Sequence, residues 1–439
     1  MKNNTVDKDW NSIFEKYKVL EAIDNRGICS ISAKQIQEFH EPRLMVKHDH
    51  SINRPKVFRD NNLAILPVTR GDYVIAKMEL YQSFIEGKEL LFTEKDVITV
   101  NPPDIESIDF KHINSEAIAI NSIYACGILS SFLEEERLLP TVCGRMGSGC
   151  FDFNVNQYRT ESSFRFSVNN SQIEIDGGFE GDNCLCLIEA KNSLSDDFLI
   201  RQLYYPYRVW REKVAKSVRP VFLCYSNGIY HLLEYKFDDP NNYNSIVLVK
   251  YSKYQIREEE SLIVLDDLSD LLNKTQIIKE PEIPFPQANS ILRVIDLCEQ
   301  LATNEECFGN RTLSKEEIAR IYGFDSRQSD YYANAGRYLG LLCKPNQATY
   351  ALSSIGRQIF CSKLSTKKKN LRIVEQIFQH KVFRDCFLRY IEKAESPTND
   401  EYMEIMRRNQ LFKMSENLIP RRSSTIMNWI NWILNLQST

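Results

Sequence analysis

Two acidic residues and a lysine stand in a stretch that otherwise has the composition of buried strands. The stretch EIDGGFEGDNCLCLIEAKN, at 174–192, carries Asp176 in its first half and Glu189 and Lys191 in its second. Charged side chains are costly to bury unless they are paired or bind a metal ion. Mg²⁺ prefers oxygen ligands, so the carboxylates of Asp176 and Glu189 and the carbonyl of Ala190 could hold one together with a substrate phosphate. This predicts metal-assisted hydrolysis of a phosphodiester, in which Lys191 polarises the attacking water or stabilises charge on the phosphate.

A buried ion pair is the plainer alternative for the same residues. Side chains alternate between the two faces of a strand, so Glu189 and Lys191 share a face, as do Glu174 and Asp176. Lys191 could therefore pair with either acid. A buried pair rarely repays its desolvation, and two acids facing one lysine leave a negative charge uncompensated. Both considerations favour the metal site.

Asp176 followed by Glu-Ala-Lys at 189–191, within the order helix, strand, strand, strand, helix, resembles the PD-(D/E)xK nuclease core. An isoleucine stands where the proline of that motif would be. The resemblance implies that Gln202 and Tyr205, in RQLYYPYR on the following helix, face the active site or the DNA backbone. It also implies that Glu116, on the preceding helix, is an additional acid near the metal.

The segments around this motif predict a mixed sheet flanked by helices. Helices are expected at 115–136 and 195–214, with Ser195 as N-cap of the second and Pro206 ending or kinking it. A glycine-rich turn, GRMGSG, is expected at 144–149, and a two-glycine turn directly after Asp176. The expected strands are 150–156, 163–168, 173–180, 184–190, 219–226 and 228–237, the last two joined by a hairpin turn at Asn227-Gly228.

The whole chain is expected to be a multidomain α+β or α/β protein. The predicted domains are an N-terminal α+β domain at 1–108, a nuclease domain at 109–278, a winged helix-turn-helix domain at 279–360, and a second helical or winged-helix-like domain at 361–439. In the first domain we expect a helix at 11–24, strands at 61–69 and 72–81, and a linker at 100–107.

The segment 289–360 resembles a winged helix-turn-helix domain, with helices at 290–303, 314–324 and 325–342 and a β-turn-β wing after them. The resemblance implies that the third helix enters the major groove of DNA. Arg327 would then contact guanine and Gln328 adenine. Phosphates or neighbouring bases would be contacted by Tyr331, Asn334 and Arg337. The alternative is that this domain only packs against another domain.

Two further regions are candidates for DNA contact. Arg421, Arg422 and Ser423 lie at the start of an amphipathic helix, where N–H groups and two arginines suit a phosphate. Trp429 and Trp432, later in the same helix, are expected in the core. The N-terminal stretch EPRLMVKHDHSINRPKVFRD, at 41–60, is rich in basic residues that could contact DNA. Its His48, Asp49 and His50 suggest a metal site only if a further ligand is near, and a solvated loop is the alternative.

Composition and charge limit the class of protein. No run of about 18 apolar residues is present, so we expect no membrane span, and the N-terminus MKNNTVDKDW lacks the apolar part of a secretory signal. Twelve cysteines without a CxxC pair predict reduced, mostly packed thiols and a cytoplasmic location, with Cys184 and Cys186 in the core. The net charge of −4 is unevenly distributed, because from Arg311 onward 21 Lys and Arg oppose 12 Asp and Glu. A basic C-terminal third indicates a polyanionic partner.

Together these features predict a Mg²⁺-dependent, sequence-specific endonuclease that cuts double-stranded DNA, of the type II restriction class. Cutting both strands needs two active sites, so a homodimer or sequential nicking by a monomer is expected. A host would need a separate cognate DNA methyltransferase to protect its own DNA. The alternatives are a defence or repair nuclease that recognises DNA structure or modification, and a non-catalytic DNA-binding regulator that retains the fold.

Overall fold

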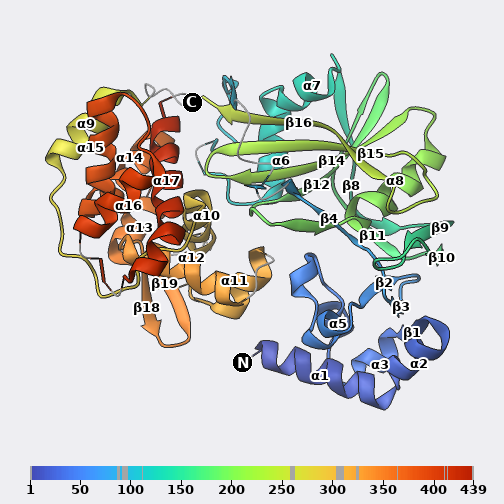
Figure 1. Ribbon diagram of the computed structural model, residues 1–439. Helices are drawn as coiled ribbons and strands as arrows, with labels where there is room; N and C mark the ends of the chain where they lie inside the picture. Colours follow the sequence, from blue (N-terminus) through green and yellow to red (C-terminus); the bar gives the residue numbers. More distant parts are fainter. Residues whose placement is uncertain are drawn as a thin grey trace.

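The computed structural model describes residues 2–86, 89–90, 97–110, 112–257, 263–302, 311–322, 326–362, 364–409, 411–412 and 414–437. A sheet of long strands adjoins two helix-rich parts (Figure 1). The N-terminal helices, drawn in blue, lie below the sheet, and the C-terminal helices, drawn in orange and red, gather to its left. The expected mixed α+β architecture is confirmed.

The N-terminal part packs short helices against a three-stranded antiparallel sheet of order β1-β3-β2. The predicted helix at 11–24 is two helices, because Lys18 has left-handed backbone angles (φ 49°) that interrupt the helical hydrogen bonds. The two predicted strands are confirmed as β2 and β3. The elements are α1 (Lys2–Lys16), α2 (Val19–Arg26), β1 (Ile28–Ser32), α3 (Ala33–Gln37), α4 (Pro42–Met45), η1 (Ser51–Asn53), α5 (Lys56–Asp60), β2 (Ala64–Pro67) and β3 (Asp72–Ala76).

A seven-stranded mixed sheet forms the centre of the protein, in the order β7-β16-β15-β14-β12-β11-β8. The pairs β12–β14 and β16–β7 are parallel, and the others are antiparallel. Strand β12 is apolar along most of its length because helices cover both faces of the sheet. The strands are β7 (Val97–Val100), β8 (Leu138–Gly147), β11 (Gln172–Gly181), β12 (Cys184–Lys191), β14 (Ser217–Ser226), β15 (Ile229–Phe237) and β16 (Ile246–Ile256).

Sequence reasoning missed both β7 and β16. β7 lies within the predicted first domain, yet it is an edge strand of the central sheet. The hairpin turn predicted at Asn227-Gly228 is confirmed, with both residues at positive φ. Smaller paired strands complete this part: β4 (Tyr81–Ser83) with β13 (Asp197–Leu199), β5 (Ile85–Glu86) with β6 (Glu89–Leu90), and β9 (Cys150–Asn156) with β10 (Ser163–Asn169).

Helices α6 (Glu116–Ala125) and α7 (Ile128–Leu133) cover one face of the sheet, and α8 (Arg201–Lys213) covers the other. The single helix predicted at 115–136 is broken at Gly127, whose φ of 68° ends the first helix. The helix predicted at 195–214 begins only at Arg201, because 197–199 pair with β4 instead. Pro206 lies inside α8 and does not end it. It removes one helical hydrogen bond, but buried packing on both sides retains the helix.

Two predicted turns are instead parts of strands. Most of 144–149 belongs to β8, and Gly177 and Gly178 lie within β11. The ladder between β11 and β8 shifts register between Ile175 and Gly178, which marks a β-bulge. A Cβ on Gly178 would approach Val142 Cβ to 2.6 Å, so only glycine allows this close crossing of the two strands.

The C-terminal part begins with α9 (Leu265–Lys274) and continues with helices and a small sheet of order β17-β19-β18. The three helices and the β-turn-β predicted between 290 and 356 are present in the predicted order. Their bounds are α10 (Ile291–Ala302), β17 (Leu313–Ser314), α11 (Lys315–Tyr322), α12 (Ser326–Tyr338), β18 (Leu342–Asn346) and β19 (Thr349–Leu352).

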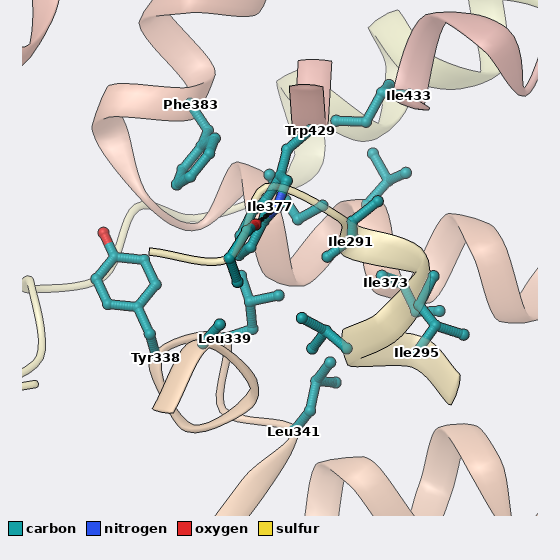
Figure 2. Close-up of a cluster of buried hydrophobic side chains, with 14 of the residues drawn as sticks. Ile291, Ile295, Tyr338, Leu339, Leu341, Ile373, Ile377, Phe383, Trp429 and Ile433 are labelled. Atoms are coloured by element: carbon teal, nitrogen blue, oxygen red, sulfur yellow. Dashed lines mark hydrogen bonds between the residues drawn. The ribbon is translucent and has the colours of Figure 1, made fainter. Parts of the chain in front are cut away.

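The residues described after β19 are helical and contain no strand. The segment from Thr366 to Lys393 forms two helices, which are separated at His380 because that residue has extended backbone angles. The elements are α13 (Ser354–Phe360), α14 (Thr366–Phe378), α15 (Lys381–Lys393), α16 (Asn399–Arg408), η3 (Glu416–Leu418) and α17 (Ile419–Asn435). The two predicted C-terminal domains share one hydrophobic core, in which Ile291 and Leu341 lie near Ile373, Phe383 and Trp429 (Figure 2).

Two general expectations from composition can be compared with the structure. The described cysteines are all free thiols, and Cys184 and Cys186 are buried as predicted. Trp429 is fully buried and Trp432 packs against the same core. None of the helices in the described ranges is long and apolar enough to cross a membrane.

A buried acid on α10 gives a prediction about stability. Asp296 is buried and its Oδ1 accepts from Ser226 Oγ at 2.8 Å, across the contact between α10 and the end of β14. Burial is the main cause that raises the pKa of Asp296 from 3.8 to about 7; Glu299 adds to it, and Tyr322 and Arg293 oppose it. Between these two values the carboxyl ionises in the unfolded chain but stays protonated in the folded protein. Stability therefore falls as pH rises through this range.

Asp296→Asn removes this pH dependence while keeping an acceptor for Ser226. We expect the variant to gain stability over the wild type as pH rises from about 4 to about 7, by about 2–4 kcal/mol at the upper end. Thermal or denaturant unfolding at several pH values measures the difference. A difference that stays constant across this pH range would contradict the assignment.

Candidate active site

The motif residues meet where the β11–β12 ladder ends. The last pair of that ladder is Gly177 with Ile188, so Asp176 and Glu189 are the next residues on the two strands. Asp176 Oδ2 accepts a hydrogen bond from the backbone N–H of Ala190 at 2.9 Å. This bond fixes the Asp176 carboxylate against the neighbouring strand, beside the bulge at Gly178.

Lys191 and Gln202 converge on the Glu189 carboxylate. Lys191 Nζ donates to Glu189 Oε1 at 2.5 Å and to the carbonyl of Ala190 at 3.0 Å. From α8, Gln202 Nε2 donates to the same Glu189 oxygen at 2.5 Å. The structure thus brings together the four side chains that the sequence singled out, from two strands and one helix.

Glu116 joins this group from the other face of the sheet. It is the first residue of α6, and Ser115 caps that helix by accepting from the N–H of Ile118. Glu116 Oε1 lies 3.8 Å from Lys191 Nζ. Burial raises the pKa of Glu116, and nearby Asp176 raises it further against the opposing effect of Lys191. The expected position of Glu116 near the other acids is confirmed.

The electrostatics give the acids and the lysine different roles. Burial raises the pKa of Glu189 to about 7, Asp176 and Glu116 push it the same way, and Lys191 opposes them. For Lys191, burial lowers the pKa, but Glu189, Glu116 and Asp176 together raise it above its usual value. Lys191 is therefore a protonated ammonium at neutral pH. It can donate hydrogen bonds and stabilise negative charge, but it cannot accept a proton.

These residues line a cleft of about 690 Å³. Residues of the N-terminal part line the same cleft, including Arg43, Lys47 and Arg70. Arg201 also lines the cleft and makes no ion pair with any described residue. Its Nε and Gln202 Oε1 are buried polar atoms without a hydrogen-bond partner in the described part of the chain. Such atoms call for a missing partner, and a bound anion with its counter-ion would supply one.

The donor set fits a magnesium ion. One carboxylate oxygen of Glu189 accepts hydrogen bonds from Lys191 and Gln202, and one of Asp176 accepts from Ala190 N–H. The second oxygen of each carboxylate could therefore bind a metal ion. Within the described ranges, no group of three or more His, Cys, Asp or Glu side chains is arranged to hold a metal ion. A site here would consist of two carboxylates, the Ala190 carbonyl, water and substrate phosphate, which is a common magnesium arrangement.

Three models of protein domains match the chain, and each describes a domain of unknown function. They are DUF6996 over residues 7–75, DUF6997 over 76–255 and DUF7226 over 293–438. Neither the curated proteins nor the solved structures gave a match. The four motif side chains fall in the second range, whereas Arg43, Lys47 and Arg70 fall in the first. The boundary that the sequence predicts at 360 lies inside the third.

The candidate base-reading residues lie on α12. Arg327 and Gln328 are exposed near its N-terminus, while Tyr331 and Asn334 are half-buried. Arg337 Nη1 donates to Asn334 Oδ1 at 2.8 Å, so these two side chains bind each other one turn apart. This pairing leaves the N-terminal half of α12 as the more accessible surface.

The start of α17 lies close to the same surface. Burial and the like charge of Arg421 lower the pKa of Arg422, and nearby Tyr331 of α12 opposes them. Arg421 is exposed and Arg422 half-buried. Ser423, in contrast, is buried and donates to the carbonyl of Pro420 at 2.9 Å. The prediction that Ser423 contacts DNA is therefore wrong, because its hydroxyl points into the protein to bond the first turn of its own helix.

Two other expectations are also corrected. Tyr205 is fully buried and donates to the carbonyl of Pro67 at 2.9 Å. It therefore faces the core, whereas Gln202 faces Glu189. His50 Nδ1 lies 2.6 Å from the carbonyl of Asp197, and burial lowers the pKa of His48 to about 4. Both histidines are buried, so the solvated loop offered as the alternative is wrong for these two residues. Within the described ranges, no group of three or more possible metal ligands includes them.

Sequence reasoning missed three of the cations that line the cleft, whereas Arg43 and Lys47 lie in the basic stretch 41–60 that was considered for DNA contact. Arg70 comes from the turn between β2 and β3, and Arg145 comes from β8, where it pairs with Glu174 at 3.0 Å. Arg201 was missed although it directly precedes Gln202. Its position next to Gln202 could have indicated that it lies near the motif. The other two are far from the motif in sequence, so only the fold brings them near.

Proposed function

We propose that this protein is a Mg²⁺-dependent endonuclease that hydrolyses phosphodiester bonds in double-stranded DNA, of the type II restriction class. The observation that carries the proposal is the convergence of Asp176, Glu189, Lys191 and Gln202 in a cleft that several cations also line. The order of elements around Asp176 and Glu189 resembles the PD-(D/E)xK nuclease core. The three helices and hairpin of 291–352 resemble a winged helix-turn-helix domain.

Each residue has a defined part in the proposed reaction. Asp176 and Glu189, with the carbonyl of Ala190, would hold Mg²⁺, which when bound supplies Lewis-acid activation of water and neutralises charge on the phosphate. Lys191 donates to the developing negative charge. Gln202 keeps the Glu189 carboxylate in its orientation. Because burial raises the pKa of Glu189 to about 7, Mg²⁺ would compete with a proton for this carboxylate.

The cations of the cleft suit the remaining backbone of the substrate. Arg43, Lys47 and Arg70 come from the N-terminal part, and Arg201 from the start of α8. Arginine matches the geometry of phosphate oxygens well. Phosphate contacts of this kind would position the DNA strand without reading its sequence. Recognition of bases is assigned to the exposed end of α12, with the start of α17 on neighbouring phosphates.

Digestion of unmethylated phage DNA in Mg²⁺ tests the proposal. Discrete bands support sequence-specific cutting by a restriction enzyme, whose host would carry a protective methyltransferase. A smear, or cutting only of branched or modified DNA, would indicate a structure- or modification-dependent nuclease instead. Intact DNA with reduced gel mobility would indicate a non-catalytic DNA-binding protein. Gel filtration with and without DNA tests the homodimer that double-strand cutting favours.

Arg327→Ala tests the base-reading surface. If Arg327 contacts a guanine, the variant loses about 1–3 kcal/mol of binding at one base position and relaxes specificity there. Binding to an oligonucleotide library, compared with the wild type, measures this loss by position. Arg407, which pairs with Glu416 at 3.0 Å, supplies a matched control because Arg407→Ala removes an arginine elsewhere in the C-terminal part. A uniform loss over all sequences would reassign Arg327 to a phosphate.

A further inference from the structure

The segment that joins Lys191 to Gln202 is held by contacts from both flanking parts of the protein. It runs through Asn192–Ile200 and includes β13. Its two ends carry two of the residues that bind Glu189, so its conformation sets their spacing. Within the central part, Cys224 Sγ donates to the carbonyl of Ser193 at 3.1 Å.

Helix α10 of the C-terminal part holds this segment from one side. Arg293 Nη2 donates to Asp196 Oδ1, and Gln300 Nε2 donates to the carbonyl of Asn192, the residue after Lys191. Arg293, Asp296 and Gln300 are spaced at i, i+3 and i+7 and so share one face of α10. Most of the other residues of the helix are apolar and belong to the C-terminal core. Burying polar side chains is costly unless they are hydrogen-bonded. Here Arg293 and Gln300 make their hydrogen bonds to the segment 192–200.

Residues of the N-terminal part hold the same segment from the other side. His50 Nδ1 lies 2.6 Å from the carbonyl of Asp197, and Ser51 N–H donates to Asp197 Oδ1 at 3.1 Å. The backbone N–H of Leu199 donates to the carbonyl of Asp49 at 3.1 Å. Neighbouring residues of one short segment are thus fixed by two different parts of the chain.

Arg293 also contacts the candidate recognition helix. Its guanidinium carbon lies 5.8 Å from the ring centroid of Tyr332 on α12, next to Tyr331. Arg293 is only 6% exposed, so its charge depends on these partners. The same side chain therefore contacts both α12 and the segment between Lys191 and Gln202.

We propose that Arg293 is a positioning residue that ties α12 to the segment between Lys191 and Gln202, so that the active site is aligned only when the C-terminal part is seated. This inference rests on the proposed nuclease function and extends it to the control of the same site. DNA bound along α12 would shift Tyr332, and the contacts of Arg293 would pass this shift on to Asp196. Arg293 touches neither metal nor substrate in this role.

Amide hydrogen exchange and single-turnover cleavage, on the full-length protein, test the tie. In Arg293→Met we expect faster exchange in peptides spanning 192–200, cleavage slower by roughly tenfold to a hundredfold, and unchanged DNA affinity. Asp196→Asn, which removes the partner at a half-buried position, is expected to do the same if Arg293→Met folds poorly. Arg293→Lys, which keeps the charge, should restore part of the rate.

Lys369→Met is the matched control, because Lys369 pairs with Glu299 of the same helix at 2.7 Å but does not contact the segment. The control should leave exchange at 192–200 and the cleavage rate unchanged. Unchanged exchange in both Arg293→Met and Asp196→Asn would overturn the inference, and so would equal effects in Lys369→Met. If the wild type cuts no DNA but exchange rises only in the Arg293 and Asp196 variants, the tie stands and the nuclease proposal fails.

Discussion

Lys191→Ala is expected to slow cleavage by at least roughly 10²–10³-fold while leaving DNA binding nearly intact. Lys191 is the one cation within 4 Å of both Glu189 and Glu116 among the described residues. Removal of a donor that stabilises charge in the transition state costs roughly 10²–10³-fold in rate. The loss of its charge also raises the pKa of Glu189, which Lys191 holds down, and this adds to the effect. Single-turnover cleavage measures the rate, and fluorescence anisotropy in Ca²⁺, another cation with oxygen ligands, measures binding.

Lys216→Ala is the control for this variant. Lys216 forms an ion pair at 2.7 Å with Glu180, which lies on the same strand as Asp176. Neither Lys216 nor Glu180 lines the cleft. This variant should cut DNA at the wild-type rate. Lys191→Arg separates charge from shape, since it keeps the cation but changes where the N–H groups lie. We expect little recovery of the cleavage rate in this variant. Cleavage by Lys191→Ala near the wild-type rate would remove Lys191 from the mechanism.

Asp176→Asn is expected to have an effect at least as large. The amide keeps the size of the side chain and an acceptor for Ala190 N–H, but it removes one of the two anionic ligands that the site would offer to Mg²⁺. We expect weaker binding of Mg²⁺ and cleavage slower by roughly 10⁴-fold or more, the scale found when one member of a cooperating catalytic group is removed. Isothermal titration with Mg²⁺ in the presence of an oligonucleotide and cleavage over a range of Mg²⁺ concentrations measure the two effects.

Glu174→Gln is the matched control on the same strand. Glu174 lines the cleft two residues from Asp176, but it is half exposed and paired with Arg145. An exposed ion pair contributes little to stability, so this variant should bind Mg²⁺ and cut DNA as the wild type does. If Glu174→Gln loses Mg²⁺ binding and Asp176→Asn keeps it, the ligand assignment is wrong.

The strand pair that carries the motif was predictable, because residues such as Cys184 and Ile188 form an apolar run typical of a strand covered on both faces. Alternation then placed Glu189 and Lys191 on one face, as the structure shows. The position of Asp176 was harder to predict. Gly177 and Gly178 resemble a turn in sequence, but they lie in a bulge of β11, where the paired strand β8 comes close to Gly178. Only the position of the neighbouring strand distinguishes a turn from a bulge here.

The walls of the cleft could not be predicted from periodicity. Arg70 is a turn residue far from the motif, and it reaches the cleft because the N-terminal part lies against the central sheet. The same limit explains the error at Tyr205. Its spacing from Gln202 fits one helix face loosely, but the rings of Phe151 and Phe153 draw Tyr205 into the core. Side-chain direction on a short helix depends on what packs there.

The position of a bound divalent cation tests the central claim most directly. Crystals grown with an uncleaved duplex oligonucleotide and Mn²⁺ would show the cation by its anomalous scattering. The account predicts a peak in contact with a carboxylate oxygen of Asp176, one of Glu189 and the carbonyl of Ala190, with a DNA phosphate beside Lys191. A cation bound elsewhere, or DNA bound with no phosphate in the cleft, would contradict it.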